Sequence, residues 1–129
     1  MDKKVMIVDD EQDILVSLQM LLERQGYEVI TVDSGVKCVN ELEKGFSGIV
    51  LMDIMMPSMD GWDTIKQIVN RGLTRNIEIE IITGKGTRNH KKTIVFGSYI
   101  NDYLSKPIDP EKLISSVNKC FMYLSKRID

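Results

Sequence analysis

The hydrophobic pattern of the chain alternates between short apolar runs and longer amphipathic segments. Short runs rich in apolar and β-branched residues are typical of strands buried in a parallel sheet. Such runs occur at 5–8, 27–32, 49–52, 77–83 and 99–104. The pattern therefore predicts five strands, of which the run at 77–83 is the richest in isoleucine.

The segments between these runs carry apolar residues at helical spacing. Between 12 and 24 they are Ile14, Leu15, Leu18, Leu21 and Leu22, which fall on one face of a helix. A last helix is predicted from Asp109 or Pro110, with Leu113, Ile114, Val117, Phe121 and Leu124 as its apolar stripe. Further helices are predicted at about 34–44, after Gly61, and at 88–98. Strands that alternate with helices indicate an α/β fold with a parallel sheet.

One local pattern conflicts with this assignment. Glu78 and Glu80 alternate with isoleucines in the fourth predicted strand. A central strand of a parallel sheet is normally apolar on both faces. We therefore expect Glu80 to lie near the lower end of its strand, partly solvated.

Composition and charge narrow the class of protein. The chain has 129 residues, 17 of them basic and 19 acidic, with a formal net charge of -2. This size fits one domain, and this charge argues against nucleic-acid binding by bulk electrostatics. The apolar runs are too short to span a membrane, and the first of them is interpreted as a strand, not a signal peptide. Cys38 and Cys120 lack metal-site spacing and are interpreted as buried thiols in a reducing cytoplasm.

Polar residues follow the predicted strands at the points where a parallel sheet binds ligands. Asp9 and Asp10 follow the first strand, Asp53 the third, Thr83 ends the fourth, and Lys106 follows the fifth. The carboxyl ends of parallel strands lie on one edge of the sheet, where ligands bind. If the first strand lies beside the third, Asp9 and Asp10 face Asp53 across this edge.

These residue types together point to phosphoryl transfer. Carboxylates that lie close repel one another, so a cation is expected among Asp9, Asp10 and Asp53. Oxygen ligands without histidine or cysteine suit Mg²⁺, which commonly leaves a position for a phosphate oxygen. Lys106 adds a positive charge and Thr83 a hydroxyl. Asp53 can itself be the nucleophile that forms an aspartyl phosphate.

Each of these residues also has an ordinary structural interpretation. Asp9 and Asp10 could cap the first helix, and Lys106 could be a solvated surface lysine. Thr83 could simply be a β-branched residue at a strand end. The combination favours the phosphoryl-transfer site over these separate roles.

The segments "VDDEQDIL", "LMDIMMPSMDGWD", "IITG" and "DYLSKP" resemble the receiver domain of two-component response regulators, in the right order over the whole chain. The resemblance is to single-domain receivers of the chemotaxis-regulator kind. It implies that Asp53 is the phosphoacceptor and that Asp10 binds Mg²⁺ directly, whereas Asp9 acts largely through water. The backbone carbonyl of Met55 would complete the protein ligands. Lys106 would pair with the phosphoryl group, next to a Lys106–Pro107 peptide bond that is cis in the family.

The resemblance also implies a switch. Thr83 would hydrogen-bond the phosphoryl oxygen, and Tyr103 matches the aromatic position that responds to it. Tyr103 could equally be packed permanently. The family often has a Gly-Ala pair where this chain has Tyr99 and Ile100, so the path from the fourth helix to the fifth strand stays open.

The expected fold is a flavodoxin-like, doubly wound five-stranded parallel sheet in the order 2-1-3-4-5, in three α/β/α layers. Right-handed crossovers then place the first and last helices on one face and the other three on the opposite face. Cys38 and Cys120 would lie on opposite faces, and no disulfide is expected between them.

The expected function is a signalling module that takes a phosphoryl group from a sensor histidine kinase or a phosphotransfer protein. It would be no enzyme beyond catalysing its own phosphorylation and dephosphorylation. It would act on an unidentified downstream protein through the fourth helix, fifth strand and fifth helix, as a cytoplasmic monomer or weak dimer without direct nucleic-acid contact or membrane insertion. We expect residues 1–129 to be one receiver domain without an output domain, either a stand-alone regulator or a fragment of a larger one.

Three rival functions are weaker. A phosphatase of the haloacid dehalogenase type needs an acid two residues after the nucleophile, where this chain has Met55. A flavodoxin-like electron carrier needs a phosphate-binding loop after the first strand, where "DDEQD" would repel a phosphate. A degenerate, non-phosphorylated receiver would lack key residues, and all of them are present.

Overall fold

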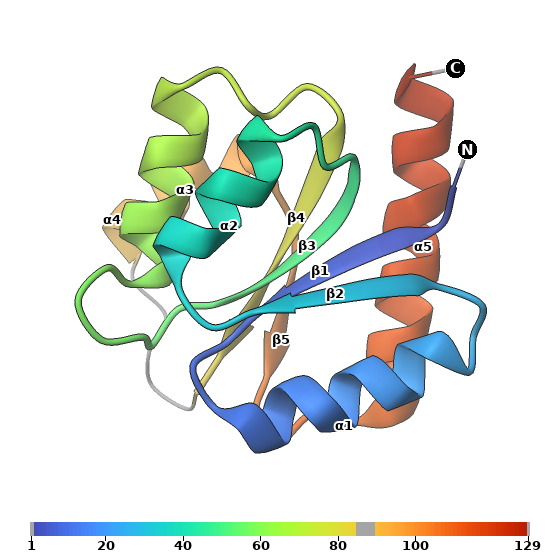
Figure 1. The fold of residues 1–129 in the computed structure, drawn as a ribbon. Coiled ribbons are helices and arrows are strands. Elements are labelled where there is room, and N and C mark those ends of the chain that lie inside the picture. Colours follow the sequence, from blue (N-terminus) through green and yellow to red (C-terminus); the bar gives the residue numbers. More distant parts are fainter. Residues whose placement is uncertain (1, 85–89, 129) are drawn as a thin grey trace.

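The computed structural model describes residues 2–84 and 90–128. In this part of the chain, five parallel strands form one sheet in the order β2-β1-β3-β4-β5 (Figure 1). The strands are β1 (Lys4–Val8), β2 (Glu28–Val32), β3 (Gly48–Asp53), β4 (Ile77–Thr83) and β5 (Ile100–Ser105). The expected strand order is thus confirmed, and the switch point of the sheet lies between β1 and β3.

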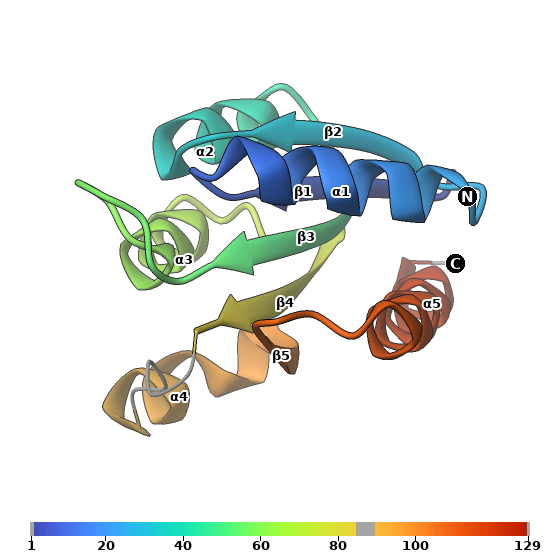
Figure 2. The same ribbon diagram turned by 90° about the horizontal axis from the view of Figure 1, so that it is seen from below.

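The helices cover both faces of the sheet. They are α1 (Gln12–Glu23), α2 (Gly35–Glu43), α3 (Gly61–Asn70), α4 (His90–Phe96) and α5 (Pro110–Ile128). Helices α1 and α5 lie on one face and α2, α3 and α4 on the other (Figure 2). Right-handed crossovers predict this division, and the structure confirms it. No helix of the described residues is long and apolar enough to span a membrane.

Two apolar clusters hold the layers together, because alternate residues of the strands point to opposite faces. The cluster beneath α2, α3 and α4 includes Met6, Val50, Ile65 and Ile79, and the one beneath α1 and α5 includes Ile7, Leu22, Ile82 and Leu113. Cys38 belongs to the first cluster and Cys120 to the second, and both are buried free thiols. The prediction that no disulfide joins them is confirmed.

Side-chain caps fix the helix starts near the carboxyl edge of the sheet. The Ser34 hydroxyl accepts a hydrogen bond from the Lys37 amide at 3.2 Å. Asp60 and Asp63 form a reciprocal capping box at the start of α3. Asp109 Oδ1 accepts the Glu111 amide at 2.9 Å, so Asp109 opens α5. These caps satisfy backbone N–H groups that a helix start leaves without partners.

The path from α4 to β5 differs from the expected single helix over 88–98. Helix α4 ends at Phe96, a 3₁₀ turn follows at Gly97–Tyr99, and β5 begins at Ile100. Residues 88 and 89 lie outside the described part of the chain. The pairing of β4 with β5 shifts register between Ile79 and Glu80, which accommodates the changed entry into β5.

The expectation for Glu80 is wrong. Its side chain is fully buried, in the middle of β4 rather than near a solvated end. Oε2 of Glu80 lies 3.0 Å from the Ser116 hydroxyl of α5. Helix α5 covers this part of the sheet, and strand alternation alone does not reveal which helix lies over an acidic position.

Candidate functional site

Two buried carboxylates meet at the carboxyl edge of the sheet. Asp9 follows β1 directly, Asp53 is the last residue of β3, and Val8 pairs with Met52. Both carboxylates are buried, whereas Asp10 is exposed. Carboxylate oxygens of all three lie within 4.8 Å of one another. The strand order therefore brings the predicted acids together.

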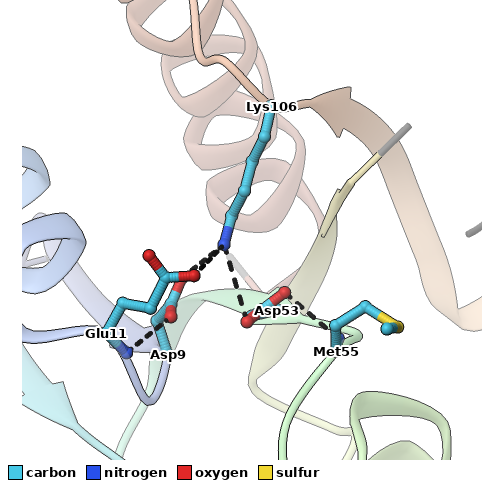
Figure 3. A network of polar contacts seen from close by, with 5 residues as sticks. All are labelled: Asp9, Glu11, Asp53, Met55 and Lys106. Carbon is cyan, nitrogen blue, oxygen red and sulfur yellow. Dashed lines mark hydrogen bonds and ion pairs between the residues drawn. The ribbon is translucent and has the colours of Figure 1, made fainter.

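Lys106 supplies the positive charge at this edge (Figure 3). Its Nζ lies 3.1 Å from Oδ2 of Asp9, 3.6 Å from Oδ2 of Asp53 and 3.7 Å from Oε1 of Glu11. The backbone amide of Lys106 donates to the Thr83 carbonyl at 2.8 Å, which ties the loop after β5 to the end of β4. The peptide bond to Pro107 is cis, as the family resemblance implies.

The acids hold Lys106 in its charged form. Burial by itself lowers the pKa of the Lys106 ammonium. The hydrogen bond to Asp9 and the charges of Asp53, Asp9 and Glu11 outweigh burial, and the pKa lies above its ordinary value.

One oxygen of Asp53 is left without a hydrogen bond. Oδ1 of Asp53 accepts the Met55 amide at 3.2 Å, and Oδ1 of Asp9 accepts the Glu11 amide at 2.9 Å. Oδ2 of Asp53 is buried and accepts no hydrogen bond from the described residues. A buried carboxylate oxygen in this position is costly unless another group binds it.

The electrostatics of Asp53 also favour a further cation. Burial and the neighbouring charge of Asp9 raise the pKa of Asp53 to about 6, although Lys106 and the Met55 amide act in the opposite direction. Within the described residues, the carboxylates of Asp9, Asp10 and Asp53 thus have one ammonium close by, that of Lys106. An all-oxygen donor set with a buried oxygen that lacks a hydrogen bond fits a hard divalent cation such as Mg²⁺.

The loop after β3 approaches Asp53 closely because of one glycine. The Gly61 amide donates to the Ile54 carbonyl at 3.0 Å and joins α3 to the end of β3. A Cβ atom at Gly61 would lie 2.5 Å from the backbone oxygen of Asp53. Only glycine fits this contact without a shift of α3 or of the Asp53 backbone.

The two predicted switch residues lie on β4 and β5. Thr83 is buried at the end of β4, one position beyond Ile82, which pairs with Asp53. Tyr103 pairs with Ile81 in the β4–β5 ladder. The Tyr103 ring is half-buried, packs against the cluster beneath α2, α3 and α4, and has a buried hydroxyl oxygen. The ring therefore already lies inward in this structure.

The structure brings Asp9, Asp10, Asp53 and Lys106 into one cluster and places Thr83 on the adjacent strand end. Two contributions were not found by sequence reasoning: the ion pair of Glu11 with Lys106, and the close approach of Gly61. Glu11 directly follows the aspartate pair, and Gly61 follows the cap of α3. Both positions are visible in the sequence, but the contacts that these residues make depend on which strands are neighbours.

The fold and this edge define a doubly wound α/β protein with an acidic site, to which Lys106 is bound, at the switch point of a parallel sheet. Residues 5–118 match the response regulator receiver domain family, and the chain belongs to this family.

Curated relatives are response regulators of about twice this length. The chain is 32% identical over 117 residues to the alkaline phosphatase synthesis transcriptional regulatory protein PhoP of Bacillus subtilis, which covers 91% of this chain and 48% of PhoP. It is 33% identical over 122 residues to the response regulator SaeR of Staphylococcus aureus, which covers 95% of this chain and 52% of SaeR. The chain thus spans about half the length of these relatives.

A solved structure agrees over nearly its whole length. A CheY-like receiver domain protein from Methanospirillum hungatei superposes with a TM-score of 0.91 at 40% identity, covering 96% of this chain and 98% of that one. The N-terminal domain of a response regulator receiver protein from Methanoculleus marisnigri superposes with a TM-score of 0.73 at 35% identity, covering 90% of this chain and 94% of that one.

Proposed function

We propose that this domain is phosphorylated on Asp53 in a Mg²⁺-dependent reaction and signals through the resulting change in conformation. The observation that carries this proposal is the buried Oδ2 of Asp53, which accepts no hydrogen bond from the part of the chain that the structure describes and lies 3.6 Å from the Lys106 ammonium. An oxygen so placed can form a bond to phosphorus, and Lys106 is in reach of the charge that the phosphoryl group brings.

The chemical step needs an ionised Asp53. A carboxylate oxygen of Asp53 attacks phosphorus of a phosphohistidine, the phosphorus–nitrogen bond breaks, and the imidazole leaves with the electron pair and takes a proton. Lys106 turns from the carboxylate toward the phosphoryl oxygens and compensates their charge. Thr83 donates its hydroxyl hydrogen to one of these oxygens. The domain would be an enzyme only toward its own phosphorylation and dephosphorylation.

Mg²⁺ would be held by the carboxylates of Asp10 and Asp53 and the backbone carbonyl of Met55, with Asp9 acting through water. When bound, this cation neutralises the carboxylates and the incoming phosphoryl oxygens. The support for this assignment is the set of carboxylate oxygens within 4.8 Å of one another, to which the described residues 2–84 and 90–128 add the ammonium of Lys106 as the close cation.

The partners follow from the family. We assign a sensor histidine kinase or phosphotransfer protein as phosphoryl donor and a protein as downstream target. Residues 1–129 form one receiver domain, a monomer or weak dimer, in the cytoplasm, where Cys38 and Cys120 stay reduced. The net charge of -2 argues against nucleic-acid binding by this domain through bulk electrostatics.

The signal is proposed to leave through α4, β5 and α5. A hydrogen bond from Thr83 to the phosphoryl group turns its side chain toward Asp53 and stabilises the inward Tyr103 beside β4. Ile94, Val95 and Tyr99 are exposed on this side and would form part of the surface that a target reads. Phosphorylation would shift the population toward the arrangement with Tyr103 inward rather than create a new state.

The direct test is labelling with acetyl phosphate. The protein should take up phosphate in the presence of Mg²⁺ and should not be labelled when EDTA replaces Mg²⁺. Asp53→Asn should abolish labelling, because an amide oxygen is a poor nucleophile. Asp13→Asn, at an exposed aspartate in the first turn of α1, is the matched control and should be labelled like the unaltered protein. Undiminished labelling of Asp53→Asn would contradict the assignment.

A further inference from the structure

A second acidic group lies away from the phosphorylation edge, between the sheet and α5. Glu80 on β4 pairs in register with Asp102 on β5. The Ser116 hydroxyl of α5 lies between them, 3.0 Å from Oε2 of Glu80 and 2.7 Å from Oδ2 of Asp102. One hydroxyl thus contacts two carboxyl groups.

The hydrogens of this contact can be counted. A serine hydroxyl carries one hydrogen and can donate it to one acceptor. Both distances are hydrogen-bond distances, so the second contact needs a hydrogen from one of the carboxyls. If Glu80 and Asp102 were both ionised, one carboxylate oxygen would face a hydroxyl oxygen with no hydrogen between them.

Glu80 is the carboxyl that fits the neutral form. Its side chain is fully buried, and among the described residues its carboxyl is contacted by the Ser116 hydroxyl and by the Cys120 thiol, which is a weak donor. An ionised carboxylate there would be far more costly than a neutral acid. Asp102 is exposed, and its Oδ1 accepts the backbone amide of Tyr103 at 2.8 Å, which suits an ionised acceptor.

The surrounding charges support this choice. Around Glu80 lie Glu78 on the same strand, Asp102 on β5 and the Cys120 thiol on α5. Arg127, the cation nearest to Glu78, is bound to that residue at 3.2 Å. Lys112 and Lys119 line the hollow over Asp102, and Lys119 and Lys126 line a second hollow that contains Glu78. The Tyr27 hydroxyl, which is bonded to Asn118, also senses the charge of Glu80.

The direction of titration agrees with the hydrogen count. Burial raises the pKa of Glu80 to about 7, and the charges of Asp102 and Glu78 act in the same direction. The hydrogen bonds of Cys120 and Ser116 only partly oppose this shift.

We propose that Glu80 is a neutral carboxylic acid that donates its hydrogen to Ser116, which in turn donates to Asp102, and that loss of this proton loosens α5 from β4 and β5. An ionised Glu80 would leave two adjacent carboxylates with one hydroxyl hydrogen. The strain is relieved when α5 moves away and admits water. The surface of α5 then depends on pH independently of any phosphorylation of Asp53.

The sign of the effect on stability follows from linkage. Between the ordinary pKa of glutamate and about 7, the folded state holds the proton that the unfolded state has lost. Stability is therefore lost as pH rises through this range and levels off above it. Glu80→Gln keeps a neutral side chain of similar shape at every pH and should remove this contribution.

The test on the unaltered protein is NMR of selectively ¹³C-labelled glutamate carboxyls, with Glu80 assigned through its backbone. We expect the chemical shift of the Glu80 carboxyl to titrate with a midpoint near neutral pH. In Asp102→Asn, which removes a neighbouring negative charge, this midpoint should move to lower pH. Titration of Glu80 in the acid range of the exposed glutamates would overturn the proposal, and this measurement needs no variant of Glu80.

Hydrogen exchange tests the effect on α5. After correction for intrinsic rates, amides of α5 near Ser116 should lose protection several-fold between pH 6 and pH 8. Glu80→Gln should retain protection, whereas Glu111→Gln, the same substitution at an exposed position of α5, should behave like the unaltered protein. Equal loss of protection in Glu80→Gln would overturn the coupling to α5.

Discussion

At the scale of single residues, the site is governed by an excess of buried negative charge. Asp9 and Asp53 are buried beside Asp10, and among the described residues Lys106 is the cation that pairs with them, at 3.1 Å from Asp9 and 3.6 Å from Asp53. Ionising Asp53 in the metal-free protein therefore works against folding. Under the proposed function the same charge excess would attract the cation, so stability and function would conflict at this point.

Asp53→Asn should stabilise the metal-free protein above pH 6. The raised pKa of Asp53 means that its stabilising proton is lost as pH rises from the ordinary aspartate value to about 6. The variant lacks this loss and should be more stable at pH 8 by about 1–3 kcal/mol, with little difference at pH 4. Urea unfolding in EDTA at both pH values measures the difference.

Addition of Mg²⁺ provides the control for this experiment. A ligand that binds the folded state raises its stability, so Mg²⁺ should stabilise the unaltered protein at pH 8 and Asp53→Asn much less. Equal stabilisation of both proteins would show that Asp53 does not contribute to the cation site.

At the scale of elements, the geometry of the site depends on how α3 meets β3. The Asp60–Asp63 capping box fixes the start of α3, and the Gly61 amide is bound to the Ile54 carbonyl. The hydrogen bond from Gly61 to Ile54 holds the backbone next to Asp53 in place. Packing at an element boundary thus positions Asp53 without touching its carboxylate.

Gly61→Ala should disturb both folding and phosphorylation. The new Cβ would lie 2.5 Å from the Asp53 backbone oxygen, so the backbone must shift. We expect a loss of about 1–3 kcal/mol in unfolding free energy, the range for overpacking, and slower labelling by acetyl phosphate. Chemical denaturation and labelling rates measure the two effects.

Gly97→Ala is the matched control for this substitution. A Cβ at Gly97 has no atom within 4 Å and the residue has no positive φ, so the change should be close to neutral. If Gly61→Ala were equally neutral in stability and labelling, the close approach of α3 would have no role.

At the scale of the whole molecule, the proposed signal crosses from Asp53 through Thr83 to Tyr103. These residues lie on β3, β4 and β5, which are neighbours in the sheet. Phosphorylation is expected to change the free-energy difference between the inactive and the active arrangement by on the order of 1–3 kcal/mol, because typical coupling energies are of this size.

Binding of beryllofluoride with Mg²⁺, which mimics the phosphoryl group, should change the NMR signals of Asp53, Thr83, the Tyr103 ring and α4. Asp53→Asn under the same conditions is the control and should show none of these changes. If Asp53 and Thr83 respond while Tyr103 and α4 do not, the signal leaves through another surface, such as that of α1 and α5.

Much of this architecture is encoded locally. The alternation of apolar runs and helical stripes predicts the order of strands and helices, and the polar residues at the strand ends are the ones that meet at the site. This works because the side-chain periods of strands and helices are fixed by backbone geometry, and because parallel strands end at one edge. The family resemblance adds the strand order and the cis bond before Pro107, both of which the structure confirms.

Other features depend on contacts that no local pattern contains. The burial of Glu80 is set by α5, whose Ser116 lies 36 residues away in sequence. The oxygen of Asp53 without a hydrogen bond and the fit of Gly61 against its backbone are likewise visible only in three dimensions. Sequence periodicity determined which side chains face a layer, because the backbone geometry of strands and helices fixes their side-chain periods. Tertiary packing determined which of these groups come into contact, and therefore which charges and hydrogen-bond donors surround each buried acid.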